Sequence, residues 1–497
     1  DRDVTGARVS GVYNFTDATR VAGKIAYQKR ESDGTNFENV GLPPRHQESL
    51  PERLEDEWIN YNLVVDADLG FADLLSSTSY LKRSVDATLD ISPFAEAAFG
   101  IVTPIWTQVP FEDHEFVQEL RLTSKNEDRL LWTLGLFYQD FDQDLFQTMP
   151  APGFDELTDG LASAFGLPDN LFNGWYSYSL DQVAAYADLS YDLTPRLELG
   201  TGARWYDIER DYTSDLAGLF AGEPFASGKA NEQGVVPRFS LSFAATDDMT
   251  MFVSAAEGFR WGGINTPEGS NQPECIVELG ALGYDGFPIS FETDSLWSYD
   301  LGVKSRWQDG RLQLNAVVYH IDWSDIQTSK YLECGVFFVQ NAGDATSDGV
   351  ELELTAGLSD KLFVDMTAQY GIAELADDVP GLGASAGDRI PGVPQFTGSV
   401  GLRYDFSAFG RAAFIRADYQ HVGKSYSDFN PEVRHELSAY DVVNLRTGLD
   451  GERWLLILFA HNIFDERGIV GLEDSNIRHA LTTITPREVG ISARWEF

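Results

Sequence analysis

Hydrophobic and polar residues alternate with a period of two through much of this chain, and the C-terminal segment shows the pattern most clearly. One face of a strand there would carry Val489, Ile491, Ala493, Trp495 and Phe497. The residues between them are charged, small or polar, so the strand has one apolar and one hydrophilic face. Such a strand suits a membrane-spanning sheet that has lipid on one side and a wet lumen on the other. The pattern therefore predicts an outer-membrane protein.

The same alternation recurs at 196–207 and at 296–307. In the second segment, Trp297 and Trp307 share the apolar face and lie ten residues apart. At about 3.3 Å per residue and a strand tilt of about 40°, this spacing is about 25 Å along the membrane normal. Because the apolar band between two aromatic girdles has that height, we predict that the two tryptophans mark its edges.

The alternating segments predict an all-β fold of about 19 strands, connected by short turns and long loops in succession. The predicted strands span residues 3–15, 20–30, 56–68, 72–90, 114–125, 130–148, 176–193, 196–213, 232–246, 250–265, 292–308, 311–329, 337–358, 362–377, 396–406, 412–428, 438–450, 453–470 and 482–497. Short polar turns fall near 16–19, 126–128, 194–195, 247–248, 309–310, 359–360 and 450–451. Long loops fall near 31–55, 91–113, 151–175, 215–231, 266–291, 377–395 and 428–437. This asymmetry is typical of a transmembrane antiparallel β-barrel.

Whether the number of strands is even or odd decides how the barrel can close. Single-chain bacterial barrels contain an even number of antiparallel strands. The first and the last predicted strand both run toward the short turns, so an odd number of further strands is expected between them. We therefore interpret residues 1–497 as one barrel domain that lacks its first strands. The alternative is a self-closing barrel of about 18 or 20 strands.

Composition narrows the class of protein. The mean hydropathy is -0.22, and no run approaches the roughly 18 to 20 apolar residues of a spanning helix, which excludes a helical membrane protein. The net charge of -42 disfavours nucleic acid as a partner, because phosphate contacts require clustered Lys and Arg. The charge suits soluble, exposed loops, and we also hypothesise that divalent cations bridge acidic outward loops to lipopolysaccharide. The N-terminus has no signal peptide, so we expect either a mature form or a chain that begins part-way through its gene.

Four stretches of the sequence resemble TonB-dependent outer-membrane receptors, and they occur in the order found in that family. They are His114–Ser124, similar to the strand FSQELRLTS; Phe252–Asn265, similar to the strand top Y-A-S-x-S-x-G-F-[KR]-x-G-x-x-N; Asn341–Thr346 with Gly349–Glu353, similar to NAGdA and GvElE; and Asn462–Asp465 with Phe497, similar to NLFD and the closing aromatic. Each stretch alone is a weak signal. Together they extend the resemblance over essentially the whole chain.

The resemblance implies a plugged barrel of about 22 strands that imports siderophores, vitamin B12 or some glycans. In the family a signal peptide, a TonB-interacting segment and a plug come before the barrel. None of these is visible here, so the resemblance implies that the plug and the first three strands are missing. It further implies a monomer in the outer membrane of a Gram-negative bacterium, surrounded by lipid and lipopolysaccharide. Its partners would be the TonB complex, acting through the missing N-terminal segment, and an extracellular nutrient, by default a ferric siderophore.

Candidate ligand-binding residues lie near the outward mouth. They are Arg260, Trp261 and Asn265, around the top of the strand 250–265, and Trp175, Tyr176 and Tyr178, which follow the loop 151–175. Aromatic faces can stack on flat ligands, and an arginine can pair with an anionic one. The alternative interpretation is that these are girdle aromatics and a lumen-lining arginine.

The two cysteines are predicted to form a disulfide. Cys275 and Cys334 fall in two outward loops that are separated by a single hairpin. An exported protein experiences an oxidising compartment, in which such a pair is stable. The alternative is two free thiols on exposed loops.

We expect no catalytic residues, no metal site and no cofactor. The segment Gly383–Gly387 matches G-x-S-x-G, but it lies in a predicted loop rather than between a strand and a helix. The seven histidines are not spaced as metal ligands. Besides a TonB-coupled receptor, two other functions stay open: a passive porin-type channel, which would conduct solutes steadily, and a soluble secreted all-β binding module, which would need no detergent.

Overall fold

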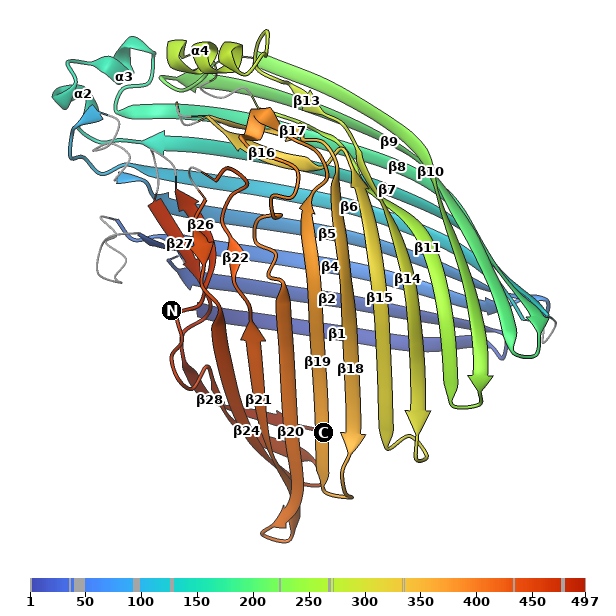
Figure 1. Ribbon diagram of the computed structural model, residues 1–497. Helices are drawn as coiled ribbons and strands as arrows, with labels where there is room; N and C mark the ends of the chain where they lie inside the picture. Colours follow the sequence, from blue (N-terminus) through green and yellow to red (C-terminus); the bar gives the residue numbers. More distant parts are fainter. Residues whose placement is uncertain are drawn as a thin grey trace.

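A single antiparallel sheet of 19 strands dominates the computed structural model of the protein. The structure describes residues 1–497 except 1, 35–36, 40–49, 93–98, 126–128, 223–224, 267–269, 271, 333, 335, 432–433, 475–478 and 497. The predicted turn at 126–128 and the closing aromatic Phe497 therefore lie outside the described residues. The 19-stranded sheet agrees with the all-β fold expected from the alternation (Figure 1).

The strands of the sheet follow the order of the chain. They are β1 (Arg2–Thr16), β2 (Thr19–Asp33), β4 (Arg53–Asp68), β5 (Ala72–Asp90), β6 (Trp106–Ser124), β7 (Leu130–Pro150), β8 (Asn170–Thr194), β9 (Leu197–Gly218), β10 (Phe225–Thr246), β11 (Met249–Arg260), β14 (Asp294–Trp307), β15 (Leu312–Ser324), β18 (Ala345–Gly357), β19 (Leu362–Leu375), β20 (Phe396–Ala408), β21 (Arg411–Val422), β24 (Tyr440–Asp450), β25 (Trp454–His461) and β28 (Glu488–Trp495). Each pairs with the next, from β1 with β2 to β25 with β28. Within the described residues, β1 and β28 have no strand partner on their other edges.

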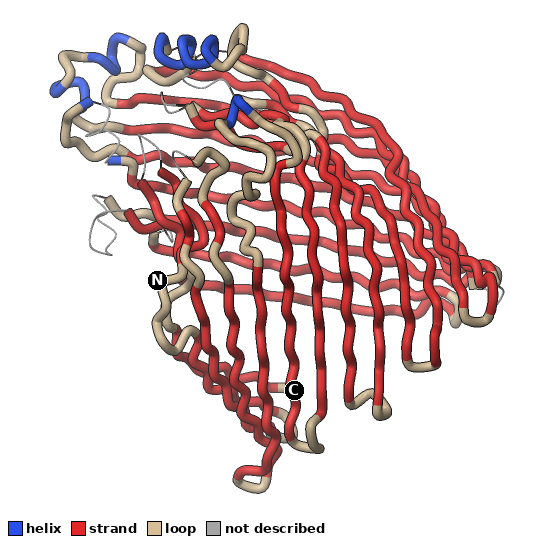
Figure 2. Tube along the Cα trace, viewed as in Figure 1, coloured by secondary structure: helices blue, strands red, loops and turns tan. Residues whose placement is uncertain are grey.

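The sheet curls, with the short turns gathered at one end and the long loops at the other (Figure 2). Small elements decorate the loop end. They are β3 (Phe37–Asn39), β12 (Gly263–Ile264), β13 (Ser290–Phe291), β16 (Gln327–Tyr331), β17 (Phe337–Asn341), β22 (Ser425–Tyr426), β23 (Glu436–Leu437), β26 (Ile469–Asp474), β27 (His479–Thr483), α2 (Phe154–Leu157), α3 (Leu161–Ala164), α4 (Pro273–Ala281) and η1 (Pro380–Leu382). None of the described helices is long and apolar enough to cross a bilayer.

The two faces of the sheet differ as the alternation predicts. On β8, one face carries apolar side chains at the turn end, among them Val183, Leu189 and Leu193, and all three are exposed. The opposite face carries Gln182 and Tyr186. We call the first face the outer wall and the second the inner wall. On β28 the exposed Val489, Ile491 and Trp495 extend the outer wall to the last strand.

Close packing on the inner wall requires glycine at particular positions. The ring of Tyr319 on β15 lies over Gly349 on β18, so that a side chain at position 349 would overlap the ring. Phe459 covers Gly490 in the same way between β25 and β28. In both places the aromatic ring occupies the position that a Cβ of the neighbouring strand would take.

The middle strands are longer than predicted. The prediction of a long loop near 215–231 is wrong, because β9 extends to Gly218 and β10 begins at Phe225. The strand predicted at 176–193 likewise begins earlier, at Asn170. These extra segments lie beyond the apolar part of the outer wall and mix single aromatic residues with polar ones on that face, so they show no regular apolar alternation.

Several predicted strands are divided in two near the loop end. The segment 311–329 forms β15 and β16, separated by Asp325 at φ 55°, and 337–358 forms β17 and β18, separated by Gly343 at φ 86°. A residue with positive φ cannot continue an extended strand. β16 and β17 therefore leave the main sheet and pair with each other.

Loops from the two ends of the sheet meet above it. β3, in the loop after β2, pairs with β27, in the loop between β25 and β28. β27 pairs in turn with β26, which makes a three-stranded sheet. The first and the last strands are therefore brought toward each other on the loop side, as the closure of a barrel requires.

Candidate functional site

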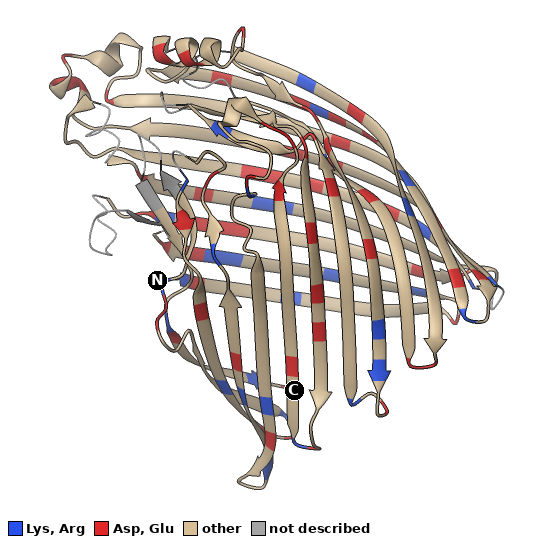
Figure 3. Ribbon diagram, in the orientation of Figure 1, with Lys and Arg blue, Asp and Glu red and all other residues tan. Residues whose placement is uncertain are grey.

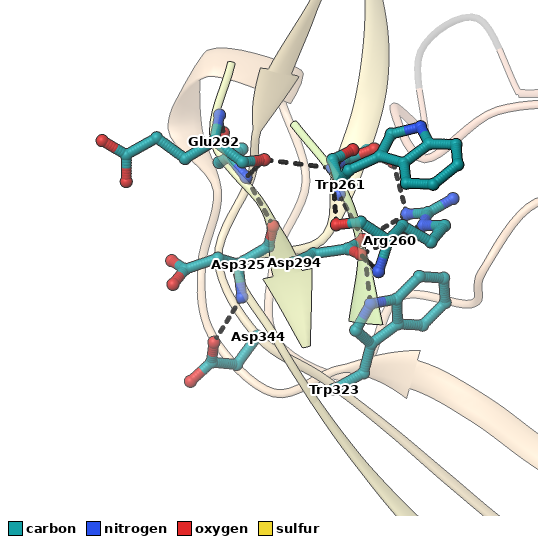
Figure 4. A network of polar contacts seen from close by, with 9 residues as sticks. Arg260, Trp261, Glu292, Asp294, Trp323, Asp325 and Asp344 are labelled. Atoms are coloured by element: carbon teal, nitrogen blue, oxygen red, sulfur yellow. Dashed lines mark hydrogen bonds and ion pairs between the residues drawn. The ribbon is translucent and has the colours of Figure 1, made fainter. Parts of the chain in front are cut away.

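A polar network at the outward ends of β11, β14 and β15 is the centre of the candidate site (Figure 4). Asp294, the first residue of β14, is only 1% exposed. Its carboxylate accepts hydrogen bonds from the backbone N–H of Arg260 at 3.2 Å, from Nε1 of Trp323 at 3.0 Å and from the backbone N–H of Gln327 at 3.2 Å. A buried charge is costly unless it is paired and hydrogen-bonded, and here both conditions are met.

Arg260, predicted as a ligand contact, supplies the opposite charge. Its Nε lies 3.1 and 3.0 Å from the two carboxylate oxygens of Asp294, and its Nη2 also donates to that carboxylate. The guanidinium lies over the ring of Trp323, 4.8 Å from the ring centroid, which adds a cation–π contact. The side chain of Arg260 is nevertheless 50% exposed, so one side of the guanidinium still faces solvent.

Trp261 is held through its backbone while 40% of the residue stays exposed. Its carbonyl oxygen accepts a hydrogen bond from Nε2 of Gln327 at 2.9 Å. Arg210, on the inner wall of β9, lies 5.9 Å from the centroid of the Trp261 ring. An exposed indole beside a guanidinium group is suited to stack on a flat, anionic ligand.

A clamp on Gly262 fixes the chain just beyond these two residues. Glu232 Oε1 on β10 accepts a hydrogen bond from the Gly262 N–H at 2.9 Å, and Arg210 donates one to the Gly262 carbonyl. Arg210 Nη2 and Glu232 Oε1 also form an ion pair at 2.9 Å. A Cβ at position 262 would overlap the carbonyl of Phe291, so the clamp requires glycine there.

The network continues from the strand ends into the long loops. Gln327 Nε2 donates to the Glu292 carbonyl at 3.0 Å, and Asn341 Nδ2 donates to the same carbonyl at 3.0 Å. Asn341 also donates to the Asp325 carbonyl at 2.8 Å, while Asp344 Oδ1 accepts from the Asp325 N–H at 3.0 Å. Figure 4 shows Asp325 and Asp344 on the side of the network away from Trp261. The loop between β11 and β14 and the loop between β15 and β18 are thus linked to each other over the mouth.

The side chain of Asn265 connects two loops by hydrogen bonds in this structure. The residue is 6% exposed, and its Nδ2 donates to the carbonyls of Pro288 and Val339 at 2.9 and 2.8 Å. Its Oδ1 accepts a hydrogen bond from the Val339 N–H at 2.8 Å. Its side chain therefore lies within the loops, and a role in contacting ligand stays a prediction.

The second predicted group, on β8, is divided between the two walls. Trp175 lies on the outer wall, 51% exposed and 4.7 Å from the ring of Phe146 between centroids. Tyr176 and Tyr178 lie on the inner wall, where both pack near Tyr212. Trp175 therefore faces away from Arg260 and Trp261. Of the two tyrosines on their wall, Tyr176 is only 5% exposed, and Tyr178 is the one that is partly exposed.

Cys275 and Cys334 form a disulfide in the structure, with their Cα atoms 5.4 Å apart. The bond joins α4 to the tip of the hairpin formed by β16 and β17. It is packed within an apolar cluster that includes Leu279 and Phe338. In the same cluster, burial raises the pKa of Tyr284, which keeps its hydroxyl protonated as a donor to Gln340. Within the described residues, no group of three or more His, Cys, Asp or Glu side chains could hold a metal ion.

Sequence reasoning found Arg260 and Trp261 but missed the residues that hold them: Asp294, Trp323, Gln327, Arg210, Glu232 and Gly262. Asp294 is 34 positions from Arg260, and no local motif connects the two. The only signal available in the sequence was the expected pairing of the strand that ends near Arg260 with the strand that begins near Asp294. Two paired antiparallel strands that are joined by an outward loop have their outward ends side by side.

Comparison with known proteins places the chain in a family of receptor-like β-barrels. Residues 1–463 match the family described as "TonB dependent receptor-like, beta-barrel". The chain is 24% identical over 467 residues to the pesticin receptor of Yersinia pestis, covering 89% of this chain and 63% of that protein. It is 25% identical over 243 residues to the metal-pseudopaline receptor CntO of Pseudomonas aeruginosa, covering 48% of this chain and 31% of that protein.

Solved structures share the fold. The ferric yersiniabactin uptake receptor FyuA from Yersinia pestis superposes with a TM-score of 0.80 at 18% identity, over 100% of this chain and 71% of that one. The siderophore receptor PiuA from Acinetobacter baumannii gives 0.74 at 15% identity, over 99% and 74%. Among the relatives found by sequence, the chain spans about 63% of the length of the pesticin receptors that it matches.

Proposed function

Since the chain belongs to the TonB-dependent receptor-like β-barrel family, we propose that it forms the barrel of a receptor that imports a scarce, bulky nutrient across the outer membrane. The match over residues 1–463 is the observation that carries the proposal. Transport would be active and coupled to the TonB complex. No covalent chemistry is needed, because the protein would bind and move its ligand unchanged.

A ferric siderophore is the first candidate for the ligand. Relatives named as receptors for ferric yersiniabactin and for metal-pseudopaline support this class. The exposed sides of Arg260 and Trp261 would meet an anionic, partly flat ligand at the mouth, with Tyr178 on the same wall. The network around Asp294 would keep these groups in position before the ligand arrives, which reduces the entropy cost of binding.

Closure of the barrel is part of the proposal. Free strand edges in lipid leave backbone groups without hydrogen-bond partners, at several kcal/mol for each group. β1 and β28 both run toward the short turns, so antiparallel closure needs an odd number of strands between them, and three would give the even total common in such barrels. The closed barrel would be a monomer in the outer membrane, surrounded by lipid and lipopolysaccharide.

The deciding experiment measures uptake of iron by cells that express the full receptor gene. The cells are supplied with iron-55 bound to catecholate, hydroxamate or phenolate-thiazoline siderophores, with and without a functional TonB complex. We expect uptake of one siderophore class that disappears without TonB. Uptake that persists without TonB would favour a passive channel, and steady ion conductance in planar bilayers would support that alternative.

A further inference from the structure

The outer wall contains a groove that the proposed transport does not use. It crosses β5 to β10 near their loop ends and has a volume of about 420 Å³. Three aromatic side chains and three carboxylates supply most of its chemistry: Phe146, Trp175, Phe225, Glu112, Asp144 and Asp215. All six lie on the outer wall, so the groove faces away from the space enclosed by the sheet.

The sequence of β8 places the groove above the apolar band. From the turn end, the outer-wall positions run from Leu193 through Leu189 to Val183, and all three are exposed apolar residues. The ten residues from Val183 to Leu193 correspond to about 25 Å along the membrane normal, the height of a hydrocarbon band. The next outer-wall position is Asp181, and Trp175 lies six residues farther along the strand. The groove therefore lies outside the hydrocarbon, beyond the outer interface.

Aromatic rings form the floor of the groove. Trp175 is 51% exposed and Phe225 is 64% exposed, and the ring of Phe146 is tilted at 38° to that of Trp175. Aromatic residues at a membrane interface serve as anchors, but these lie too far from the apolar band for that role. Exposed rings gathered in a concave site are typical of a surface that binds a partner.

Carboxylates form the rim. Glu112 has partial partners in Lys82 at 3.7 Å and His114 at 3.9 Å. Asp144 and Asp215 have exposed side chains, and neither forms an ion pair in the described part of the chain. Figure 3 shows that acidic positions recur along these strands. Ionised carboxylates only accept hydrogen bonds, so the rim repels phosphate and requires a partner that carries donors or positive charge.

We propose that this groove binds an ammonium-bearing sugar of the glycolipid that surrounds the receptor in the outer leaflet. The negative faces of Trp175 and Phe225 attract an ammonium group, and Asp144 and Asp215 neutralise it. A groove on the outer wall, just beyond the hydrocarbon, is adjacent to the saccharide part of the leaflet rather than to the transported ligand. The inference rests on the outer-membrane location in the proposed function, but not on the identity of the transported nutrient.

Titration calorimetry with the full chain, purified from outer membranes in detergent, tests the proposal. The probe is a β-linked glucosamine tetramer, and its N-acetylated counterpart serves as a control of the same shape without charge. Two variants remove one element each: Trp175→Ala removes the aromatic floor, and Asp215→Asn removes one charge. Glu209→Gln, on the outer wall of the same strand as Asp215 but outside the groove, is the matched control.

We expect the glucosamine tetramer to bind and the N-acetylated tetramer not to bind. Affinity should fall about threefold with Trp175→Ala and about tenfold with Asp215→Asn, and it should stay unchanged with Glu209→Gln. No binding at millimolar probe, equal binding of the two tetramers, or full affinity in both groove variants would overturn the proposal. Tighter binding of an oligolysine with the same loss in both variants would also overturn it, in favour of a peptide site.

Siderophore uptake separates this proposal from the proposed transport function. The groove variants should import iron at the rate of the unaltered receptor, because the groove lies on the opposite wall from Arg260. If uptake is absent in every protein while the glucosamine tetramer still binds, transport fails and the groove assignment stands. If uptake is normal and the tetramer does not bind, the groove assignment fails and the proposed transport stands.

Discussion

The mouth network and the outer-wall groove contain the same kinds of residue, a tryptophan beside carboxylates, yet they use them in opposite ways. At the mouth, Asp294 is buried and accepts hydrogen bonds from Arg260, Trp323 and Gln327. In the groove, Asp144 and Asp215 are exposed and lie beside an exposed indole. The difference teaches that satisfied carboxylates hold the structure together, whereas unsatisfied ones at a surface are available to bind a ligand.

The largest expected effect comes from breaking the covalent link on the mouth side. The disulfide Cys275–Cys334 closes a loop with a sequence separation of 59. In the chain-entropy model, a loop of about this length is stabilised by about 4 kcal/mol. Replacing both cysteines by serine should therefore greatly increase amide hydrogen exchange in α4 and in the β16–β17 hairpin. Exchange in β6 to β8, which line part of the groove, should not change, and equal increases in both regions would contradict the separation of the two.

Removing the central carboxylate of the mouth should have the next largest effect. Asp294→Ala would leave the guanidinium of Arg260 without its partner and the Trp323 N–H without an acceptor. Breaking a buried pair costs about 3–5 kcal/mol, and the half-exposed arginine reduces this to about 2–3 kcal/mol. Limited proteolysis should then cut the loop 325–344 faster than in the unaltered protein.

Asp215→Asn in the groove is the matched substitution for Asp294→Ala, because it removes a carboxylate that has no ion pair in the described residues. It should leave proteolysis unchanged. Faster cutting in both variants, or in neither, would remove the contrast between the two sites.

The clamp on Gly262 gives a smaller effect with a precise control. Gly262→Ala would push a methyl group into the Phe291 carbonyl, and overpacking of this kind costs about 1–3 kcal/mol. Gly280→Ala, in α4, meets nothing within 4 Å and should be neutral or stabilising. Siderophore affinity should fall only in the first variant. Loss of affinity in both would show that the loops respond to any change of sequence.

The smallest effect concerns the acidic loop between β7 and β8. Hydrogen bonds from the Ser163 side chain and from the backbone N–H groups of Ser163 and Asp169 hold the pKa of Asp155 below its usual value. A group whose pKa is lowered on folding contributes stability at higher pH, and that contribution is lost as the pH falls through the folded pKa. Exchange of the Ser163 amide should therefore rise at pH 3 relative to pH 6, once corrected for intrinsic rates. Asp155→Asn should abolish this dependence on pH. A dependence that survives the substitution would show that the Asp155 carboxylate does not cause it.

The sequence predicts which residues lie on each wall of the sheet better than it predicts the lengths of the strands. Alternation identified the outer wall of β28 through Val489 and Ile491, because the apolar residues there are all exposed on one face. It missed the loop-end segments of β8 to β10, where Trp175 and Phe225 stand among polar residues on the outer wall and no regular alternation continues. Backbone pairing beyond the apolar part of the outer wall extends these strands, and pairing leaves no periodic apolar signal.

The candidate site was predictable only in part. Arg260 and Trp261 stood out by residue type near the end of a strand, but the partners of Arg260 come from other strands and carry no local signature. Trp175 and Tyr176 were grouped as one candidate set, although neighbours in a strand point to opposite faces. That parity was available in the sequence and would have assigned the tryptophan to the outer wall.

Site-directed spin labelling along β8 tests the two-walled arrangement most directly. Single cysteines are introduced at 175, 177, 183, 185, 187 and 189 on the outer wall and at 182 and 184 on the inner wall, with the native disulfide kept oxidised. In lipid bilayers we expect high accessibility to oxygen at 183–189 on the outer wall, and high accessibility to a water-soluble nickel reagent at 175 and 177. Equal accessibility to the nickel reagent at every outer-wall position would contradict the membrane location. Lipid exposure at 175 would contradict the placement of the groove above the apolar band.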